Sequence, residues 1–321
     1  MTLPRLDLSD VAFVGDSLDR PECVMTTRSG DLFVPNKRGG VSVIRADGGT
    51  DHVFANEPPE GFLPNGIALL PDRSFLIANL GPTGGVYHLA QDGTLTPRLL
   101  KLNGKPLEPT NFVGIDRQSR VWVTVSTRLI PRERSMRRGY ADGYIILIDE
   151  RGARVVAEDI GFTNEAIVDP SGQWLYVNET IARCTSRFPI GQDGSLGRKE
   201  IFAQYGASTF PDGFAFDAEG GVWIVSVVSN RVIRATPDGK QDLILEDADP
   251  DVTEAAEAAF QNDTYNRSHL DAGGKRTLGN LSGIAFGGED LRTVYLGSLF
   301  GSRIARFRSP IAGAEPVHWK F

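Results

Sequence analysis

One residue pattern recurs six times along this chain and limits the fold more than any other feature. Each copy has a polar residue, a short apolar strand, a turn of Gly, Asp or Ser, and a second strand rich in Val, Trp, Tyr and Ile. Two examples are TNEAIVDPSGQWLYV and PDGFAFDAEGGVWIV. The copies begin at Pro21, Pro64, Thr110, Thr163, Pro211 and Leu281. Because repeats of this size bury their apolar faces against their neighbours, we expect one repetitive architecture.

The remainder of each repeat adds a third strand, a turn such as Gln91-Asp92-Gly93, and a fourth strand. Four antiparallel strands repeated six times predict an all-β fold, a six-bladed β-propeller with four-stranded antiparallel blades. The repeats run from about residue 10 to the end. We therefore expect residues 1–321 to form a single propeller domain.

One position in each repeat carries an oxygen-bearing side chain. When the repeats are aligned on the strand that follows, this position holds Glu22, Asn65, Asn111, Asn164, Asp212 and Ser282. We call these six residues the polar column. A propeller arranges equivalent positions around one axis, so the six side chains are expected to converge there.

The polar column has the composition of a cation site. Glu22 and Asp212 supply negative charge, and the three asparagines supply neutral amide oxygens. This all-oxygen set suits one hard divalent cation, for which Ca²⁺ is the first candidate and Mg²⁺, Mn²⁺ or Zn²⁺ are alternatives. In the competing interpretation, each Asn or Asp only caps its own backbone at a strand entry. The mixture of Glu, Asn and Asp at one aligned position favours a shared site.

The spacing of the column residues indicates two insertions. Successive intervals are 43, 46, 53, 48 and 70 residues, and a four-stranded blade needs about 40 to 50. The excess lies at about 127–142 and 246–279, and propeller connectivity places both segments on the face that carries the column. We expect them to act as lids, with DVTEAAEAAF in the second forming a short helix. Ordinary loop variation and subunit contacts are the alternatives.

The first insertion is rich in arginine: it contains Arg128, Arg132, Arg134, Arg137 and Arg138. In an otherwise acidic chain, this concentration favours the attraction of an anionic substrate. Arg137 and Arg138 are the candidate substrate contacts, and His269 in the second insertion is another. A solvated loop or a subunit contact would explain the same charges.

Composition and motifs exclude several function classes. A net charge of −7 and a pI near 5.3 argue against a nucleic-acid-binding surface. The N-terminus MTLPRLDLSD lacks the features of a secretion signal, and no stretch approaches about 18 apolar residues. We therefore expect a cytoplasmic protein without membrane association, as a monomer or small homo-oligomer. Cys23 and Cys184 are expected to be buried thiols.

The sequence has no G-x-S-x-G elbow, Walker loop, H-E-x-x-H or dinucleotide-binding motif. Its four histidines also lack the spacing of metal ligands. The polar column is therefore the strongest chemical signal in the chain.

Over nearly its whole length, the chain resembles the senescence marker protein (regucalcin)/gluconolactonase family. The resemblance rests on Pro21-Glu22, the strand before LYVNET, the PDGFAFDAEGGVWIV block and GIAFGGEDLRTVYLGS. It implies a six-bladed propeller with one catalytic divalent metal in an axial pocket, which hydrolyses lactones. Diisopropylfluorophosphatase and the drug-responsive lactonase are similar in architecture. By position, the resemblance implies metal ligation by Glu22, Asn164 and Asp212, and contact of Asn111 with substrate or metal.

Two positions depart from the family pattern. Sugar-lactone members carry Arg-x-Asn-Asp where this chain has Pro109-Thr110-Asn111-Phe112, and Asn164 is followed by Glu165 instead of glycine. The arginine that would hold a sugar hydroxyl or carboxylate is therefore absent from that segment. We expect a less polar lactone or ester than gluconolactone.

The sequence thus predicts a divalent-metal-dependent lactonase that opens a cyclic ester with metal-activated water. Asp212 is the first candidate for the general base, and Glu165 is the second because it adjoins a ligand. Asn65 and Asn111 are expected to orient the substrate or stabilise the developing oxyanion. Alternatives are a phosphotriester or fluorophosphate hydrolase, a metal-dependent lyase or isomerase, and a non-catalytic calcium-binding propeller.

Overall fold

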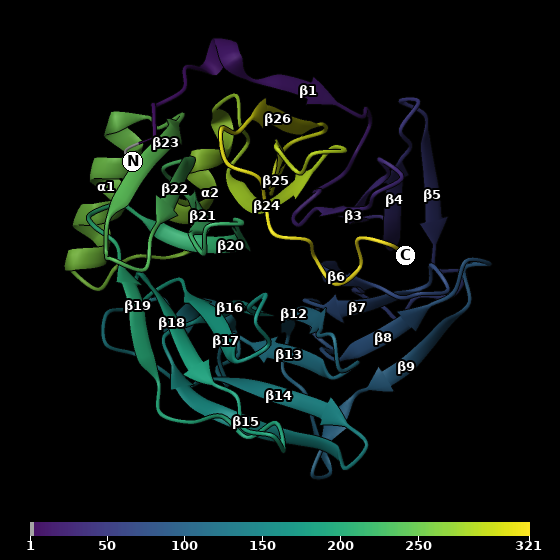
Figure 1. The fold of residues 1–321 in the computed structure, drawn as a ribbon. Helices are drawn as coiled ribbons and strands as arrows, with labels where there is room; N and C mark the ends of the chain where they lie inside the picture. Colours follow the sequence, from purple (N-terminus) through teal and green to yellow (C-terminus); the bar gives the residue numbers. More distant parts are fainter. Residues whose placement is uncertain (1–2) are drawn as a thin grey trace.

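The computed structural model describes residues 3–321 and confirms the six-bladed β-propeller (Figure 1). Six four-stranded antiparallel sheets stand in a ring. Blade 1 consists of β2 (Met25–Thr26), β3 (Leu32–Asn36), β4 (Gly40–Ile44) and β5 (Thr50–Phe54). Blade 2 consists of β6 (Pro64–Leu69), β7 (Phe75–Asn79), β8 (Val86–Leu89) and β9 (Leu95–Leu99). A short hairpin of β10 (Lys101–Leu102) and β11 (Lys105–Pro106) follows it.

The next three blades also use consecutive strands. Blade 3 consists of β12 (Thr110–Ile115), β13 (Val121–Val125), β14 (Gly143–Asp149) and β15 (Gly152–Ile160). Blade 4 consists of β16 (Thr163–Val168), β17 (Trp174–Glu179), β18 (Cys184–Pro189) and β19 (Glu200–Gln204). Blade 5 consists of β20 (Phe210–Phe216), β21 (Val222–Val227), β22 (Arg231–Ala235) and β23 (Gln241–Glu246).

The sixth blade joins the two ends of the chain. Its strands are β24 (Leu281–Gly287), β25 (Thr293–Ser298), β26 (Ile304–Arg308) and β1 (Ala12–Val14), which follows the short helix η1 (Leu8–Asp10). The order β1-β26-β25-β24 makes the N-terminal strand the outer edge of this blade, with Phe13 opposite Ala305. The repeat pattern predicted the blade but not this pairing.

Apolar side chains fill the spaces between neighbouring blades. Trp122 and Ile145 of blade 3, for example, pack in one buried cluster with Leu175 and Val177 of blade 4. The strands are rich in β-branched and aromatic residues because such side chains pack well on a pleated surface. Core contacts therefore hold each inner strand at a fixed position around the axis.

Two repeats contain the same side-chain bond between a turn and the second strand. Asp116 accepts the indole N–H of Trp122 at 2.8 Å, and Asp217 accepts that of Trp223 at 2.9 Å. Both acids are buried, so the indole supplies a hydrogen bond that water cannot. This bond fixes the turn that follows the inner strand.

The two insertions contain every helix of residues 3–321 except η1. The first contains η2 (Arg132–Ser135), and the second contains α1 (Pro250–Gln261), α2 (Arg267–Ala272) and η3 (Gly273–Lys275). The helix predicted for DVTEAAEAAF is thus confirmed. Asp249 caps α1 by accepting the backbone N–H groups of Asp251 and Val252. Met136 of the first insertion shares a buried cluster with Phe260 of the second, so the two segments pack together.

The C-terminal segment after β26 crosses the central space of the ring (yellow in Figure 1). Gly313 forms a β-bridge with Asp217, and the carbonyl of Trp319 accepts the backbone N–H of Arg28 at 2.8 Å. These contacts tie the segment to blades 5 and 1. No helix within residues 3–321 is long and apolar enough to cross a membrane.

Candidate active site

A break in strand pairing occurs at the polar column in five blades. The pairing register shifts between Pro64 and Ile67, Thr110 and Phe112, Thr163 and Ala166, Pro211 and Phe214, and Leu281 and Gly283. Each shift contains one column residue. Because a bulge bends the strand and changes where a side chain points, these breaks allow the polar groups to leave the strand alternation and meet.

Hydrogen bonds join neighbouring column residues. Asn65 donates from Nδ2 to Oε1 of Glu22 at 2.9 Å and to the carbonyl of Asn111 at 2.8 Å. Asn111 in turn donates from Nδ2 to Oδ1 of Asn164 at 2.8 Å. Asn164 donates to Oγ1 of Thr180 at 3.1 Å. The structure thus brings Glu22, Asn65, Asn111 and Asn164 together.

Ser282 has a different role from the other members of the column. Its hydroxyl donates to the backbone carbonyl of Glu22 at 2.7 Å. The bond supports the loop that carries Glu22 and closes the ring between blades 6 and 1.

Asp212 has a buried oxygen whose hydrogen-bonding capacity is unused. Its Oδ1 has no hydrogen-bond partner among residues 3–321, and the residue is 7% exposed. Burial, together with the negative charge of Glu22, raises the pKa of Asp212 well above its ordinary value. Burial also raises the pKa of Glu22. Two buried acids that repel each other favour a cation between them.

The donor types at this place fit a hard divalent cation. Glu22 and Asp212 offer carboxylate oxygens and Asn164 offers an amide oxygen, which are ligands that Ca²⁺ and Mg²⁺ prefer. The unpartnered Oδ1 of Asp212 is the best-placed of these atoms, since no other contact competes for it. With three protein ligands, such a cation would keep open positions for water and substrate.

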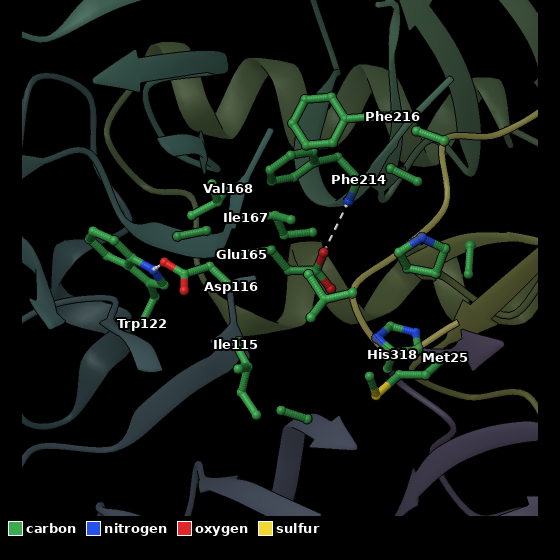
Figure 2. Close-up of a pocket in the computed structure, with 18 of the residues that line it drawn as sticks. Met25, Ile115, Asp116, Trp122, Glu165, Ile167, Val168, Phe214, Phe216 and His318 are labelled. Atoms are coloured by element: carbon green, nitrogen blue, oxygen red, sulfur yellow. Dashed lines mark hydrogen bonds between the residues drawn. The ribbon is translucent and has the colours of Figure 1, made fainter. Parts of the chain in front are cut away.

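Glu165 faces an axial cavity that is also lined by Cys23 and Phe112, neighbours of column residues in the sequence, but by no column residue itself (Figure 2). The cavity has a volume of about 170 Å³, is lined by inner strands of the blades, and is bordered by His318 of the C-terminal segment. Oε2 of Glu165 accepts the backbone N–H of Phe214 at 3.1 Å. Burial, followed by the charge of Glu22, raises the pKa of Glu165 well above its ordinary value.

The predicted substrate contacts of the insertions, Arg137, Arg138 and His269, each have a local partner. Arg137 is exposed and stacks on the ring of Tyr140, and Arg138 donates to Gln261 at 3.0 Å. His269 is half-buried, and its Nδ1 accepts the backbone N–H of Asn266 at 3.2 Å in the cap of α2. The structure gives these side chains partners within the insertions.

Two other guanidinium groups contact the column directly. Arg20 donates from Nη2 to Oδ1 of Asn65 at 2.7 Å, and Arg132 donates from Nη2 to Oδ1 of Asn111 at 3.3 Å. Arg132 belongs to the arginine-rich insertion but was not predicted as a site residue, and Arg20 was not predicted either. The only sequence signal for Arg20 is its position two residues before Glu22.

Comparison with known proteins matches the chain to a family model and to a lactonase. The model of the SMP-30/Gluconolactonase/LRE-like region matches residues 21–256. The chain is 28% identical over 226 residues to 6-deoxy-6-sulfogluconolactonase of Pseudomonas putida. That alignment covers 69% of this chain and 65% of the relative, so it spans less than two thirds of the relative's length.

Solved structures share the fold at low sequence identity. A gluconolactonase from Xanthomonas campestris superposes with a TM-score of 0.67 at 17% identity, covering 95% of this chain and 89% of that one. The calcium-binding protein regucalcin from Agrobacterium tumefaciens gives 0.66 at 18%, covering 96% and 98%. These likenesses show a common architecture. Since the family model extends over more than half of the sequence, the chain belongs to the SMP-30/gluconolactonase/LRE-like family.

Proposed function

We propose that this protein is a lactonase that depends on a divalent cation held by Glu22, Asn164 and Asp212. The observation that carries the proposal is the buried Oδ1 of Asp212, which lacks a partner among the described residues. A buried polar atom of this kind costs free energy unless a ligand satisfies it. A cation would do so and would offset the repulsion between Asp212 and Glu22. The calcium-binding regucalcin structure supports Ca²⁺ as the first candidate, with Mg²⁺, Mn²⁺ and Zn²⁺ as alternatives.

When bound, the cation would polarise the lactone carbonyl and lower the pKa of a bound water. Asp212 would hold the cation through Oδ1 and would accept the water proton through its other oxygen, Oδ2. Glu165 is the second candidate, because burial gives its carboxylate a high proton affinity and it adjoins Asn164. Asn111 would orient the carbonyl from its place between Asn65 and Asn164.

Asn65 has a supporting role in this proposal. Both of its amide N–H groups are engaged, by Glu22 and by the carbonyl of Asn111, and Arg20 occupies its oxygen. No donor remains for the substrate, in contrast to the expectation from the sequence. Asn65 therefore positions Glu22.

The substrate class that we propose is a lactone of a polar sugar acid. The Pseudomonas putida relative is named as a sulfogluconolactonase, and the Xanthomonas campestris structure is that of a gluconolactonase. Arg20 and Arg132 supply guanidinium groups beside the column although Pro109-Thr110-Asn111-Phe112 lacks one. This arrangement favours a polar lactone over the less polar ester expected from that segment alone.

The test is hydrolysis by protein stripped with a chelator and then resupplied with Ca²⁺, Mg²⁺, Mn²⁺ or Zn²⁺. Substrates are a panel of γ- and δ-lactones beside a paraoxon-type phosphotriester, followed with a pH indicator. We expect metal-restored turnover of lactones, with the mass of one water added to the product. Turnover that is insensitive to chelation, activity on the phosphotriester alone, or a product without added water would contradict the proposal.

A further inference from the structure

Two guanidinium groups from separate segments contact the polar column, and a third lies near enough for its charge to act on them. Arg20 precedes β2, Arg132 belongs to η2 of the first insertion, and Arg267 begins α2 of the second. Arg20 contacts Asn65 and the carbonyl of Pro64, and Arg132 contacts Asn111 and Oγ of Ser126 at 3.1 Å. The group is assembled by tertiary structure, since its members are far apart in the sequence.

Each of these cations lies within the electrostatic influence of the others. Burial, followed by the positive charge of Arg267, lowers the pKa of Arg132 to about 10. Burial also lowers the pKa of Arg20, against the opposing effect of Glu22, and Arg267 adds to the lowering. Bringing cations together in a buried place is unfavourable unless negative charge compensates them.

The carboxylates of Glu22, Asp212 and Glu133 compensate these charges only at longer range. Among residues 3–321, neither Arg20 nor Arg132 has a carboxylate oxygen within the 4.0 Å of an ion pair, and their closest contacts go to neutral oxygens. Arg267 pairs with Asp271 at 2.7 Å, but its side chain is 39% exposed. Arginine has five N–H donors, so donors remain for a ligand.

Two buried donors of this region are also unpartnered within the described chain. Nε of Arg132 and the hydroxyl of Tyr265 have no hydrogen-bond partner. Tyr265 is 4% exposed and stacks on Phe210. Burial raises the pKa of Tyr265, the charges of Arg183 and Arg267 oppose this shift, and those of Asp271 and Asp212 add to it. A buried donor without a partner indicates a missing acceptor.

We infer that Arg20, Arg132 and Arg267, with the hydroxyl of Tyr265, bind an anionic group that the substrate carries in addition to its lactone. This inference rests on the proposed lactonase function and specifies its substrate class. Guanidinium groups donate paired N–H bonds to the oxygens of carboxylate, sulfonate or phosphate. Because Arg20 and Arg132 each touch an asparagine of the column, the anionic group would lie beside the reacting carbonyl and orient it.

The first experiment compares neutral and anionic lactones in Arg132→Gln and in the matched control Arg134→Gln, an exposed arginine of the same helix. The substrates are δ-gluconolactone and its analogues with phosphate, sulfonate or carboxylate at the sixth carbon, which separate the three anions. We expect Arg132→Gln to lower kcat/KM by roughly ten- to hundredfold more for at least one analogue than for the neutral lactone. Equal losses on neutral and anionic substrates would overturn the inference.

Tyr265→Phe is a second variant that keeps the ring on Phe210 and removes only the hydroxyl. We expect this variant to lose part of the preference for anionic over neutral lactones, by a smaller factor than Arg132→Gln. Its melting temperature should be unchanged. If Arg132→Gln fails to fold, Tyr265→Phe decides the same question. An unaltered ratio of anionic to neutral kcat/KM in a folded Tyr265→Phe protein would then contradict the assignment.

A binding experiment separates this inference from the lactonase proposal. Wild-type protein and Arg132→Gln are titrated calorimetrically with gluconate and with 6-phosphogluconate or 6-deoxy-6-sulfogluconate, which are not lactones. We expect wild-type protein to bind at least one of the two analogues at least about tenfold more tightly than gluconate. Arg132→Gln should not show this difference. If no lactone is hydrolysed, the proposed function fails, while this preference still supports the anion site. Equal affinity of the wild-type protein for gluconate and for both analogues would overturn the proposed anion site.

Discussion

Asn65 donates one amide N–H to Glu22 at 2.9 Å and the other to the backbone of Asn111 at 2.8 Å. One side chain therefore connects a carboxylate of blade 1 to the inner strand of blade 3. Arg20 completes the arrangement by donating to the remaining oxygen of Asn65. Glu22 is held in place by this network, so the affinity of the proposed cation site depends on a residue that does not itself coordinate.

Asn65→Ala should weaken cation binding by roughly ten- to hundredfold, as is typical when the partner of a metal ligand is removed. The reason is that Glu22 loses its donor and gains freedom to turn away. Calorimetric titration with Ca²⁺, combined with kcat and KM, measures the effect. An effect on KM alone, with unchanged cation affinity, would show that Asn65 contacts the substrate instead.

Asp212→Asn should abolish lactone turnover, by at least about a hundredfold, and reduce the bound metal. The substitution keeps the shape but removes the charge on which cation affinity depends. Ser282→Ala is the control, because that hydroxyl serves the backbone of Glu22, and it should keep most of the metal. Elemental analysis of the purified proteins, alongside activity, makes the comparison. Full activity and metal content in Asp212→Asn would refute the site.

Removal of the cation should lower the melting temperature. A ligand that binds only the folded state adds about 2.7 kcal/mol of stability at 100 times its Kd, so wild type should melt several degrees lower in excess chelator. Differential scanning calorimetry with and without Ca²⁺ checks this. The shift should vanish in Asp212→Asn, whereas an equal shift in both proteins would place the stabilising cation elsewhere.

The Arg183–Glu257 ion pair should make the docking of α1 sensitive to acid. Its Nη2–Oε2 distance is 2.8 Å. Burial alone would raise the pKa of Glu257, but hydrogen bonds from Arg183 and its neighbours lower it to about 2. A lowered folded-state pKa adds stability above the unfolded value, near 4.5, and that stability is lost as the pH falls through about 2.

The matching experiment uses Glu257→Gln and the exposed control Glu254→Gln. Urea unfolding at pH 7, 4 and 3 should show Glu257→Gln less stable than wild type at pH 7, with a difference that shrinks as the pH is lowered. Glu254→Gln should follow wild type throughout. A difference that grows on acidification would mean that the pair does not stabilise the fold in this way.

Gly313→Ala should destabilise the C-terminal segment. A Cβ at this position would lie 2.1 Å from Cβ of Phe286, and overpacking of this kind costs about 1–3 kcal/mol. Gly206→Ala is the matched control, because a Cβ there has no atom within 4 Å. Urea midpoints and protease cleavage near the C-terminus report the effect. Equal urea midpoints and equal cleavage of the two variants would show that the C-terminal segment accommodates the added methyl group without loss of stability.

The sequence alone determined the parts of this protein that depend on local pattern. Alternating apolar residues and turn residues recur in every blade, so the strand count and the six-bladed ring followed from their repetition. The polar column followed in the same way, because equivalent repeat positions meet at the axis of a propeller. Glu22, Asn65, Asn111 and Asn164 are joined by hydrogen bonds, and Asp212 lies beside them within reach of the charge of Glu22.

Tertiary structure decided what local pattern does not encode. The pairing of β1 with β26, the contacts of Arg20 and Arg132 with the column, and the path of the C-terminal segment each join residues from distant segments. Arg132 looks like Arg137 and Arg138 in the sequence, yet it alone of the three donates to a column residue. Loop conformation sets this difference, since packing of the two insertions against each other fixes which guanidinium points inward and which meets water.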